Sequence, residues 1–195
     1  MKFLFDLGGV FFDWDPNHFY KEIIKNKHER EYFLKNICND AWNIEQDRGR
    51  LIKDAENELV IKHPNFKQEI IMYYKNHRKM FRRIFDKSVK ILKLLKLKQY
   101  ECYVLSNWSW ETFIGMEKDF PFLKLFDDLI ISGNEKMIKP NKEIYNLAIS
   151  RFNLIPKETV FIDDKIENIN TAQRLGFKTI HLNNPKLIIS EINKY

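Results

Sequence analysis

Cysteine is scarce in this chain. Only Cys38 and Cys102 occur among 195 residues, and they form no paired motif. This usage excludes a disulfide framework and indicates a reducing compartment, so we predict a cytoplasmic protein. Histidine is also sparse. The five histidines show no metal-ligand spacing such as His-x-x-x-His, which leaves a zinc site without support.

Long apolar runs are absent as well. No segment approaches the roughly 20 apolar residues that a membrane-spanning helix requires, so we expect no membrane partner. The opening stretch MKFLFDLGGVFF superficially resembles a signal peptide. Asp6 interrupts the apolar run early and no small-residue cleavage site follows, so we expect this stretch to belong to the folded protein.

Acidic residues are in the minority, with 27 aspartates and glutamates against 33 lysines and arginines. The densest basic pieces are HRKMFRR at 77–83 and KILKLLKLK at 90–98. The second is typical of a helix with a solvated lysine face. Because Lys, Asn and Ile are abundant throughout, we attribute the excess charge to composition and predict no nucleic-acid partner. We expect a monomer or a weak homodimer.

Five short apolar runs are rich in Val, Ile, Leu or Phe, as expected of central parallel strands. They occupy residues 2–7, 101–106, 128–132, 159–163 and 178–182. Helical patterns lie between them. Ser88 caps one, Pro140 and Asn141 open another, and a third runs from 166 to 175 and stops at Gly176. Strands that alternate with helices predict an α/β fold.

The region from about residue 16 to residue 85 differs, because it contains no convincing strand. Its helical periods are punctuated by Gly49 and Pro64. Its apolar anchors are Phe33, Trp42, Leu59 and Tyr73. We predict a core formed by residues 1–13 and 86–195, with residues 14–85 inserted after the first strand as a helical unit and candidate lid.

Polar residues follow the predicted strands. They are Asp6 after the first, Ser106 and Asn107 after the second, Lys136 and Lys139 after the third, and Asp163 and Asp164 after the fourth. Ligands bind at the carboxyl ends of the strands in a parallel α/β sheet, so we expect these side chains to converge. An Asp after a strand is usually only a turn former or helix cap, and it is the joint arrangement that indicates a site.

The converging groups suit phosphoryl transfer. Clustered carboxylates without histidine favour a hard cation, most simply Mg²⁺. A carboxylate such as Asp6 can also act as the nucleophile, and the glycines beside it allow close approach of a phosphate. Ser106 and Asn107 can hold phosphate oxygens, while Lys139 offsets the accumulated negative charge. The expected partner is therefore a small phosphorylated metabolite.

These motifs resemble those of the haloacid dehalogenase superfamily. FDLGGV at 5–10 resembles its first motif, LSN at 105–107 its second, KP at 139–140 its third and DD at 163–164 its fourth. The resemblance covers nearly the whole chain. It implies a Rossmann-like parallel-sheet core in three layers, and the position of the insert resembles the type-1 helical cap of the family.

The resemblance also implies a role for each motif residue. Asp6 resembles the nucleophile and a Mg²⁺ ligand, and Gly8 the position whose backbone carbonyl binds the metal. Asp164 resembles a direct metal ligand, and Asp163 the residue that holds a metal-bound water. Ser106 and Asn107 resemble phosphate binders, and Lys139 the lysine that steadies nucleophile and phosphate. Asn168 is placed either to support the metal shell or on a helix surface.

Gly8 departs from the family pattern. Most phosphatases of this family carry at that position a second Asp, which protonates the leaving group. Such help is typically worth ~10²–10⁴-fold. The Asp-Leu-Gly form with Asp13-Trp14-Asp15 soon after is similar to a subgroup that includes bacterial α-D-glucose-1-phosphate phosphatase. A hexose 1-phosphate, whose hemiacetal leaving group is acidic, is therefore our predicted type of substrate.

Without an acid at Gly8, rates should depend steeply on the pKa of the leaving group, and Gly8→Asp should flatten that dependence. A flat dependence would indicate another acid, with Asp13 the first to test. We expect Asp13 to close a hairpin turn, with a water-mediated acid role as the alternative. Asp15-Pro16 reads as a helix N-cap followed by a first-turn proline.

The helical insert is expected to select the substrate. Trp42, Asn43, Gln46 and Arg48 lie in AWNIEQDRGR at 41–50. They either meet the substrate or form the insert's own core and a solvated helix face. Trp108 and Trp110 either line the entrance of the site or fill the seam between core and insert.

Two alternatives to a Mg²⁺-dependent phosphatase stay open. A hydrolytic 2-haloacid dehalogenase also uses an Asp nucleophile and lacks the second Asp, although the adjacent Asp163 and Asp164 argue against a metal-free site. A non-catalytic protein that binds a phosphorylated ligand is the other alternative, and Gly8 is the feature that supports it.

Overall fold

The computed structural model describes every residue from Met1 to Tyr195. Its main sheet is entirely parallel, with the strand order β5-β4-β1-β6-β7. The strands are β1 (Lys2–Phe5), β4 (Glu101–Ser106), β5 (Asp128–Ile131), β6 (Thr159–Asp163) and β7 (Lys178–His181). All five strands predicted from the sequence are present, and the predicted α/β fold is confirmed.

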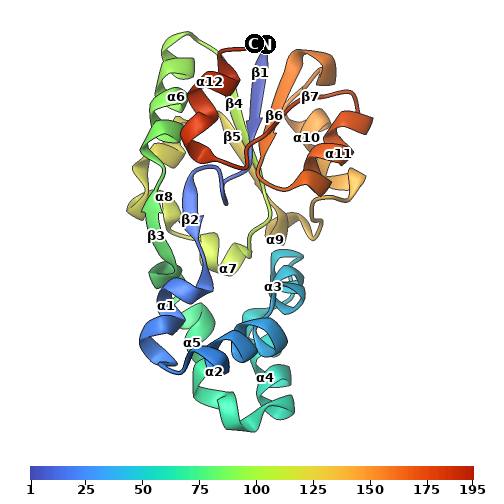
Figure 1. The fold of residues 1–195 in the computed structure, drawn as a ribbon. Coiled ribbons are helices and arrows are strands. Elements are labelled where there is room, and N and C mark those ends of the chain that lie inside the picture. Colours follow the sequence, from blue (N-terminus) through green and yellow to red (C-terminus); the bar gives the residue numbers. More distant parts are fainter.

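Helices cover both faces of this sheet, which gives three layers (Figure 1). One face carries α6 (Asp86–Leu97) and α12 (Ile188–Ile192), and the other carries α10 (Lys142–Arg151) and α11 (Ile166–Arg174). The alternation along β1 explains why both faces are apolar. Phe3 and Phe5 join the first core cluster, whereas Leu4 joins the second.

Shorter helices lie in the loops around the sheet. They are α7 (Trp110–Phe113), α8 (Met116–Asp119) and α9 (Ser132–Glu135). Single turns of 3₁₀-helix span Pro121–Leu125, Pro156–Glu158 and Pro185–Leu187. The first residue of each of these turns is proline, whose fixed φ suits a helical start.

Five helices form a separate cluster, which we call the helical segment (residues 16–80). They are α1 (Pro16–Ile23), α2 (Lys27–Tyr32), α3 (Asp40–Asp47), α4 (Ile52–Lys62) and α5 (Lys67–Lys75). Pro64–Phe66 and His77–Met80 are 3₁₀ turns, and Phe33–Ile37 is a π-helical turn. The segment has its own apolar core, which contains the four predicted anchors. It lies beyond one end of the sheet, opposite both chain termini (Figure 1).

No helix in the structure combines the length and the apolar character needed to cross a membrane.

A two-stranded antiparallel ribbon joins the helical segment to the sheet. It consists of β2 (Phe12–Trp14) and β3 (Phe81–Ile84). The prediction that residues 16–85 contain no strand is therefore wrong. The FRRI sequence of β3 hides its strand character, because Arg82 and Arg83 face solvent and only one side of the ribbon is covered. Packing of Phe81 against Phe12 holds that covered side.

Helix boundaries differ from expectation at one place. Helix α6 begins at Asp86, and Ser88 does not cap it, so that prediction is wrong. The buried Ser88 hydroxyl instead donates a hydrogen bond of 2.6 Å to the carbonyl of Val10, which ties the helix to the loop after β1. The cap predicted at Asp15 is confirmed, because its carboxylate accepts from the Asn17 backbone N–H.

Candidate active site

The site is built where three neighbouring strands end. β1 lies between β4 and β6, so the residues that follow or end these strands meet at one edge. The Ser106 hydroxyl donates a hydrogen bond of 2.7 Å to Asp6 Oδ1. Asp163, the last residue of β6, lies on the other side of Asp6. The sequence prediction that these three side chains converge agrees with this geometry.

Lys139 lies between the two carboxylates. Its Nζ is 3.0 Å from Asp6 Oδ1 and 2.7 Å from Asp163 Oδ2, and the side chain is 1% exposed. Burial acts to lower the pKa of Lys139, but the charges and hydrogen bonds of Asp163 and Asp6 outweigh it and raise that pKa above the ordinary value. Lys139 is therefore a fixed cation at the centre of the site.

Asn107 holds the backbone of Lys139. Its side-chain amide donates to the Lys139 carbonyl over 2.9 Å, and its amide oxygen accepts from the Lys139 N–H over 2.8 Å. This pair of hydrogen bonds joins the loop after β4 to the loop before α10. A second amide hydrogen of Asn107 stays available. Its predicted contact with phosphate thus stays a prediction, and its contact with Lys139 is a positioning role that the motif did not reveal.

Asp6, Asp163 and Asp164 form a cluster in which one oxygen of each carboxylate lies within 4.8 Å of the others. Burial raises the pKa of Asp6; the nearby Lys139 opposes this, and the Asp163 charge adds to it. Burial and then the charges of Asp6 and Asp163 raise the pKa of Asp164 to about 7. A divalent cation would relieve this accumulation of charge, and an all-oxygen set of ligands suits Mg²⁺.

Gly9 makes room for this cluster. A Cβ built on Gly9 would lie 2.4 Å from Asp164 Cγ, and the residue has a φ of +65°. A Cβ built on Gly8, in contrast, meets nothing within 4 Å. The Gly8 carbonyl accepts a hydrogen bond of 2.7 Å from the Val10 N–H. A carbonyl has a second lone pair, so a metal contact at Gly8 stays a prediction.

Two further groups orient Asp163 through three hydrogen bonds. The Lys165 N–H donates to Asp163 Oδ1 over 2.8 Å, and the Asn168 side-chain amide lies 3.0 Å from both carboxylate oxygens. Asn168 is 2% exposed, so it supports the carboxylate cluster and does not lie on a helix surface. This settles the alternative that the sequence left open at Asn168.

Asp13 lies in β2 and not in a hairpin turn, so that prediction is wrong. The chain pairs β2 with a strand that is distant in sequence. The Asp13 carboxylate is 3.3 Å from Arg83 Nε and 3.3 Å from His18 Nε2. The ion pair with Arg83 and the hydrogen bond with His18 hold Asp13 on the ribbon, which removes support for the alternative role as an acid.

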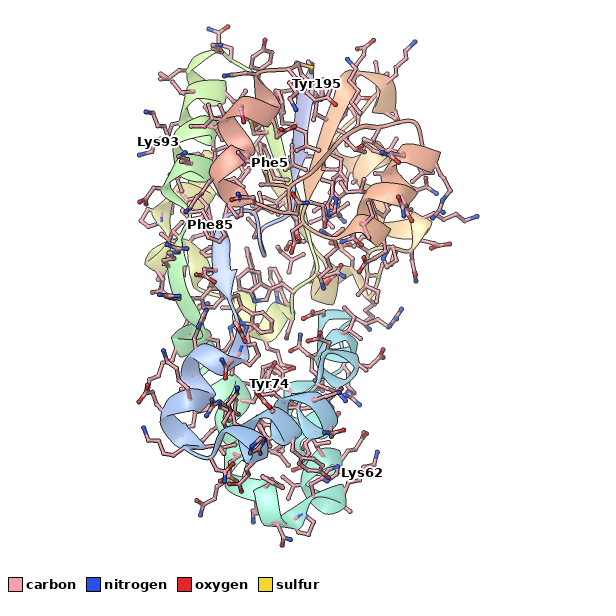
Figure 2. All side chains as sticks on the ribbon, in the orientation of Figure 1. Phe5, Lys62, Tyr74, Phe85, Lys93 and Tyr195 are labelled. Carbon is pink, nitrogen blue, oxygen red and sulfur yellow. The ribbon has the colours of Figure 1, made fainter.

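Most of the polar residues proposed for the helical segment are engaged within it. Trp42 is buried in the segment core. The Gln46 amide donates to the Tyr74 hydroxyl over 2.8 Å, and that hydroxyl donates to Asn43 Oδ1 over 2.9 Å. Arg48 forms an ion pair with Glu45 on the same helix. Figure 2 shows Tyr74 on the side of the segment that faces the sheet.

The two tryptophans after β4 have different environments. Trp108 is buried and stacks on Phe81 of the ribbon, with ring centroids 5.5 Å apart. It therefore packs the seam between the sheet and the helical segment. Trp110 is 42% exposed.

Sequence reasoning missed Asp47, the last residue of α3. This half-buried side chain interacts with loops that follow β4 and β6. Burial raises the pKa of Asp47 to about 7, and the charge of Asp6 contributes to this rise. A hydrogen bond from the Ser109 backbone N–H and the charge of Lys165 act in the opposite direction. Asp47 belongs to the segment AWNIEQDRGR, but helical periodicity does not reveal which residues meet a separate core.

Comparisons with known proteins agree with this architecture. Residues 4–182 match the family described as haloacid dehalogenase-like hydrolase. A sesquiterpene phosphatase from Aspergillus oryzae is 26% identical over 180 residues, which are 92% of this chain and 88% of that protein. A phosphorylated carbohydrates phosphatase from Thermotoga maritima is 20% identical over 183 residues, 91% of this chain and 82% of that protein.

A solved structure gives the same result. A HAD family enzyme from Bacteroides thetaiotaomicron, in complex with magnesium and inorganic phosphate, has a TM-score of 0.70 to this chain. The two are 25% identical, and the match covers 92% of each chain. Because the family match includes both the sheet and the helical segment, and the fold agrees, this chain belongs to the haloacid dehalogenase-like hydrolases.

Proposed function

We propose that this protein is a Mg²⁺-dependent phosphatase that hydrolyses a small phosphate ester through a phosphoaspartate on Asp6. The observation that carries this proposal is the cluster of Asp6, Asp163 and Asp164 around the buried cation Lys139. A nucleophile, a fixed cation and oxygen ligands for a metal thus share one edge of the sheet. Such chemistry depends mainly on positioning and electrostatic stabilisation.

Each residue has a defined task in this proposal. Ser106 and Leu7 both donate their hydrogen bonds to Asp6 Oδ1. The other oxygen, Oδ2, accepts neither of them and is the atom that attacks phosphorus. Lys139 and Ser106 hold the Asp6 carboxylate in one orientation. Mg²⁺, held by Asp6, Asp164 and the Gly8 carbonyl, would neutralise charge on the transferring phosphoryl group.

The helical segment is proposed to act as a cap that excludes water and selects the substrate. We propose a sugar phosphate such as a hexose 1-phosphate as the substrate. Two arguments support this choice. The T. maritima relative is a phosphorylated carbohydrates phosphatase, and a hemiacetal leaving group departs more readily than an ordinary alcohol when Gly8 supplies no acid.

The alternative of a 2-haloacid dehalogenase is less consistent with the site. A dehalogenase of this type needs no metal, so two further carboxylates beside the nucleophile would raise the free energy of its charged state without benefit. The pKa of Asp164, raised to about 7, supports this argument.

An assay with p-nitrophenyl phosphate tests the proposed function. We expect turnover in the presence of Mg²⁺, complete loss after EDTA treatment and recovery when Mg²⁺ is restored. A panel of sugar phosphates then ranks substrates. Metal-independent turnover would contradict the mechanism, and failure to hydrolyse any ester in a broad panel would favour a non-catalytic phosphate-binding protein.

Replacing Gly9 by alanine should disable the proposed metal site. The added Cβ would lie 2.4 Å from Asp164 Cγ, so the Asp164 carboxylate must move, and a positive φ adds roughly 1 kcal/mol of strain. We expect Mg²⁺-dependent turnover to fall at least ~10²-fold, with a higher Mg²⁺ concentration needed for half-activity. Gly8→Ala is the matched control, since its Cβ meets no atom within 4 Å and the carbonyl is kept. Equal losses in the two variants would show that crowding of Asp164 is not the cause.

A further inference from the structure

We propose that Asp47, carried on α3 of the helical segment, is the catalytic acid and base that stands in for the carboxylate missing at Gly8. This inference rests on the proposed phosphatase function. It assigns to the helical segment a part in the chemistry in addition to the selection of substrate.

Backbone contacts fix the position of Asp47 against the sheet. The hydroxyl of Ser132, the first residue of α9, donates a hydrogen bond of 2.5 Å to the Asp47 carbonyl. Two residues on, Gly49 approaches α9 so closely that a Cβ would lie 2.8 Å from the Gly133 carbonyl oxygen. A Cβ on Gly133 would in turn lie 2.5 Å from the Trp110 N–H nitrogen. The end of α3 is therefore seated on the loops that surround the phosphate-transfer residues.

The Asp47 carboxylate lies where it can act. Asn43 donates to Asp47 Oδ2 over 3.3 Å, and the Ser109 backbone N–H also interacts with the carboxylate. Asp6 lies near enough for the two negative charges to influence each other. Asp47 is only half-buried, so the residue is not sealed within the protein.

The charged groups around Asp47 come from three elements. Asp6 follows β1, Lys165 follows β6, and Asp40 lies in the first turn of α3 itself. Lys165 lowers the pKa of Asp47, whereas burial and the two aspartates raise it, to about 7. A carboxyl group with this pKa is partly protonated at neutral pH, which is the condition for an acid that must also act as a base.

Other titratable groups are poorly placed for this task. Asp13 is held by Arg83 and His18 on the ribbon. His77 is buried among aromatic rings, which lowers its pKa to about 3 and keeps it neutral. Asp163 accepts hydrogen bonds from Lys139 and Asn168 on both of its oxygens.

In the proposed reaction Asp47 gives up one proton in the first step and takes one back in the second. Asp6 attacks phosphorus, the bond from phosphorus to the leaving-group oxygen breaks, and the Asp47 carboxyl gives its proton to that oxygen. An alcohol leaves, and Asp47 is then a carboxylate. In the second step Asp47 takes a proton from a water molecule whose oxygen attacks phosphorus. The bond to Asp6 breaks, inorganic phosphate is released and both aspartates return to their starting states.

A series of phosphate esters with leaving groups of different pKa tests this role. With Asp47 as the acid, we expect the unmodified protein to show a shallow dependence of kcat/KM on leaving-group pKa, in place of the steep dependence predicted from Gly8 alone. Asp47→Asn keeps the size of the side chain and should make that dependence steep. An alkyl ester should lose ~10²–10⁴-fold, whereas p-nitrophenyl phosphate, whose leaving group needs no proton, should lose less than about 5-fold in the phosphorylation step. That step is measured as the rate of p-nitrophenolate release in single-turnover experiments, with the protein in excess over the ester.

Two variants serve as controls. Glu45→Gln removes another carboxylate of α3, one that pairs with Arg48. This variant should leave the rates of hydrolysis of both esters unchanged. Gly8→Asp combined with Asp47→Asn should restore alkyl-ester hydrolysis, since a Cβ at Gly8 meets no atom within 4 Å. This rescue separates a missing acid from a misplaced cap.

The outcomes are separable. Equal losses of both esters in Asp47→Asn would assign Asp47 only to the seating of α3 and overturn the inference, while the phosphatase function would stand. A steep dependence in the unmodified protein would also overturn it. Absence of any ester hydrolysis by the unmodified protein would overturn the proposed function, and the role of Asp47 would fail with it.

Discussion

Asp6→Asn is expected to abolish phosphatase turnover, with a loss of roughly 10⁴-fold or more. The amide has nearly the same shape as the carboxylate but cannot attack phosphorus, and it removes one oxygen from the cluster that would hold Mg²⁺. Steady-state hydrolysis of p-nitrophenyl phosphate measures the loss. Persistent activity in this variant would exclude Asp6 as the nucleophile.

The covalent intermediate can be observed directly. Acid quenching during turnover of a ³²P-labelled ester should trap label on the unmodified protein, and hydroxylamine should release it, as expected for an acyl phosphate. Asp6→Asn should trap none. Asp13→Asn is the matched control, because Asp13 is an aspartate held on the ribbon by Arg83 and His18, and this variant should retain both label and turnover within about 3-fold.

Loss of activity in Asp6→Asn should not reflect unfolding. Burial raises the pKa of Asp6, which means that the folded state holds this charge at a cost. A neutral amide avoids that cost and can still accept the hydrogen bond from Ser106, while Lys139 keeps its contact with Asp163. We expect a midpoint of urea unfolding close to that of the unmodified protein.

The parts of the site that the sequence predicted share one property. Each lies at the end of an apolar strand or in the segment that follows one, and a parallel sheet brings its strand ends together at one edge. This geometry explains why local patterns predicted that Asp6, Ser106, Lys139 and Asp163 converge, as their contacts show. The five strands themselves were recognisable because their burial on both faces removes polar residues from them.

The parts that the sequence missed depend on contacts between distant segments. β3 is a strand because it pairs with β2, some 70 residues away in the sequence. Two of its four residues are arginine, so its own sequence does not indicate a strand. Asn107 is drawn to the Lys139 backbone by an arrangement of two loops. Asp47 meets the sheet edge through the seating of one helix on another. None of these contacts leaves a periodic signal in the chain.

Lys139→Met should be the most destabilising single change in the site. Methionine matches the length of the apolar stem but leaves Asp6 and Asp163 buried without their cation. Removing one partner of a buried ion pair typically costs ~3–5 kcal/mol in the free energy of unfolding. Urea unfolding in the absence of Mg²⁺ measures this cost, and turnover should fall ~10³-fold because the nucleophile loses its orientation.

Lys136→Met is the matched control, since Lys136 also precedes α10 but is exposed. We expect it to change stability by less than about 0.5 kcal/mol and to leave turnover intact. Saturating Mg²⁺ should recover part of the lost stability of Lys139→Met, because a cation bound by the carboxylates stabilises the folded state by mass action. It should not restore turnover, because the bound cation does not orient Asp6 as Lys139 does. Equal stability of the two variants in the absence of Mg²⁺ would show that Asp6 and Asp163 do not both carry charge in the folded protein, and the proposed electrostatic role of Lys139 would then fail.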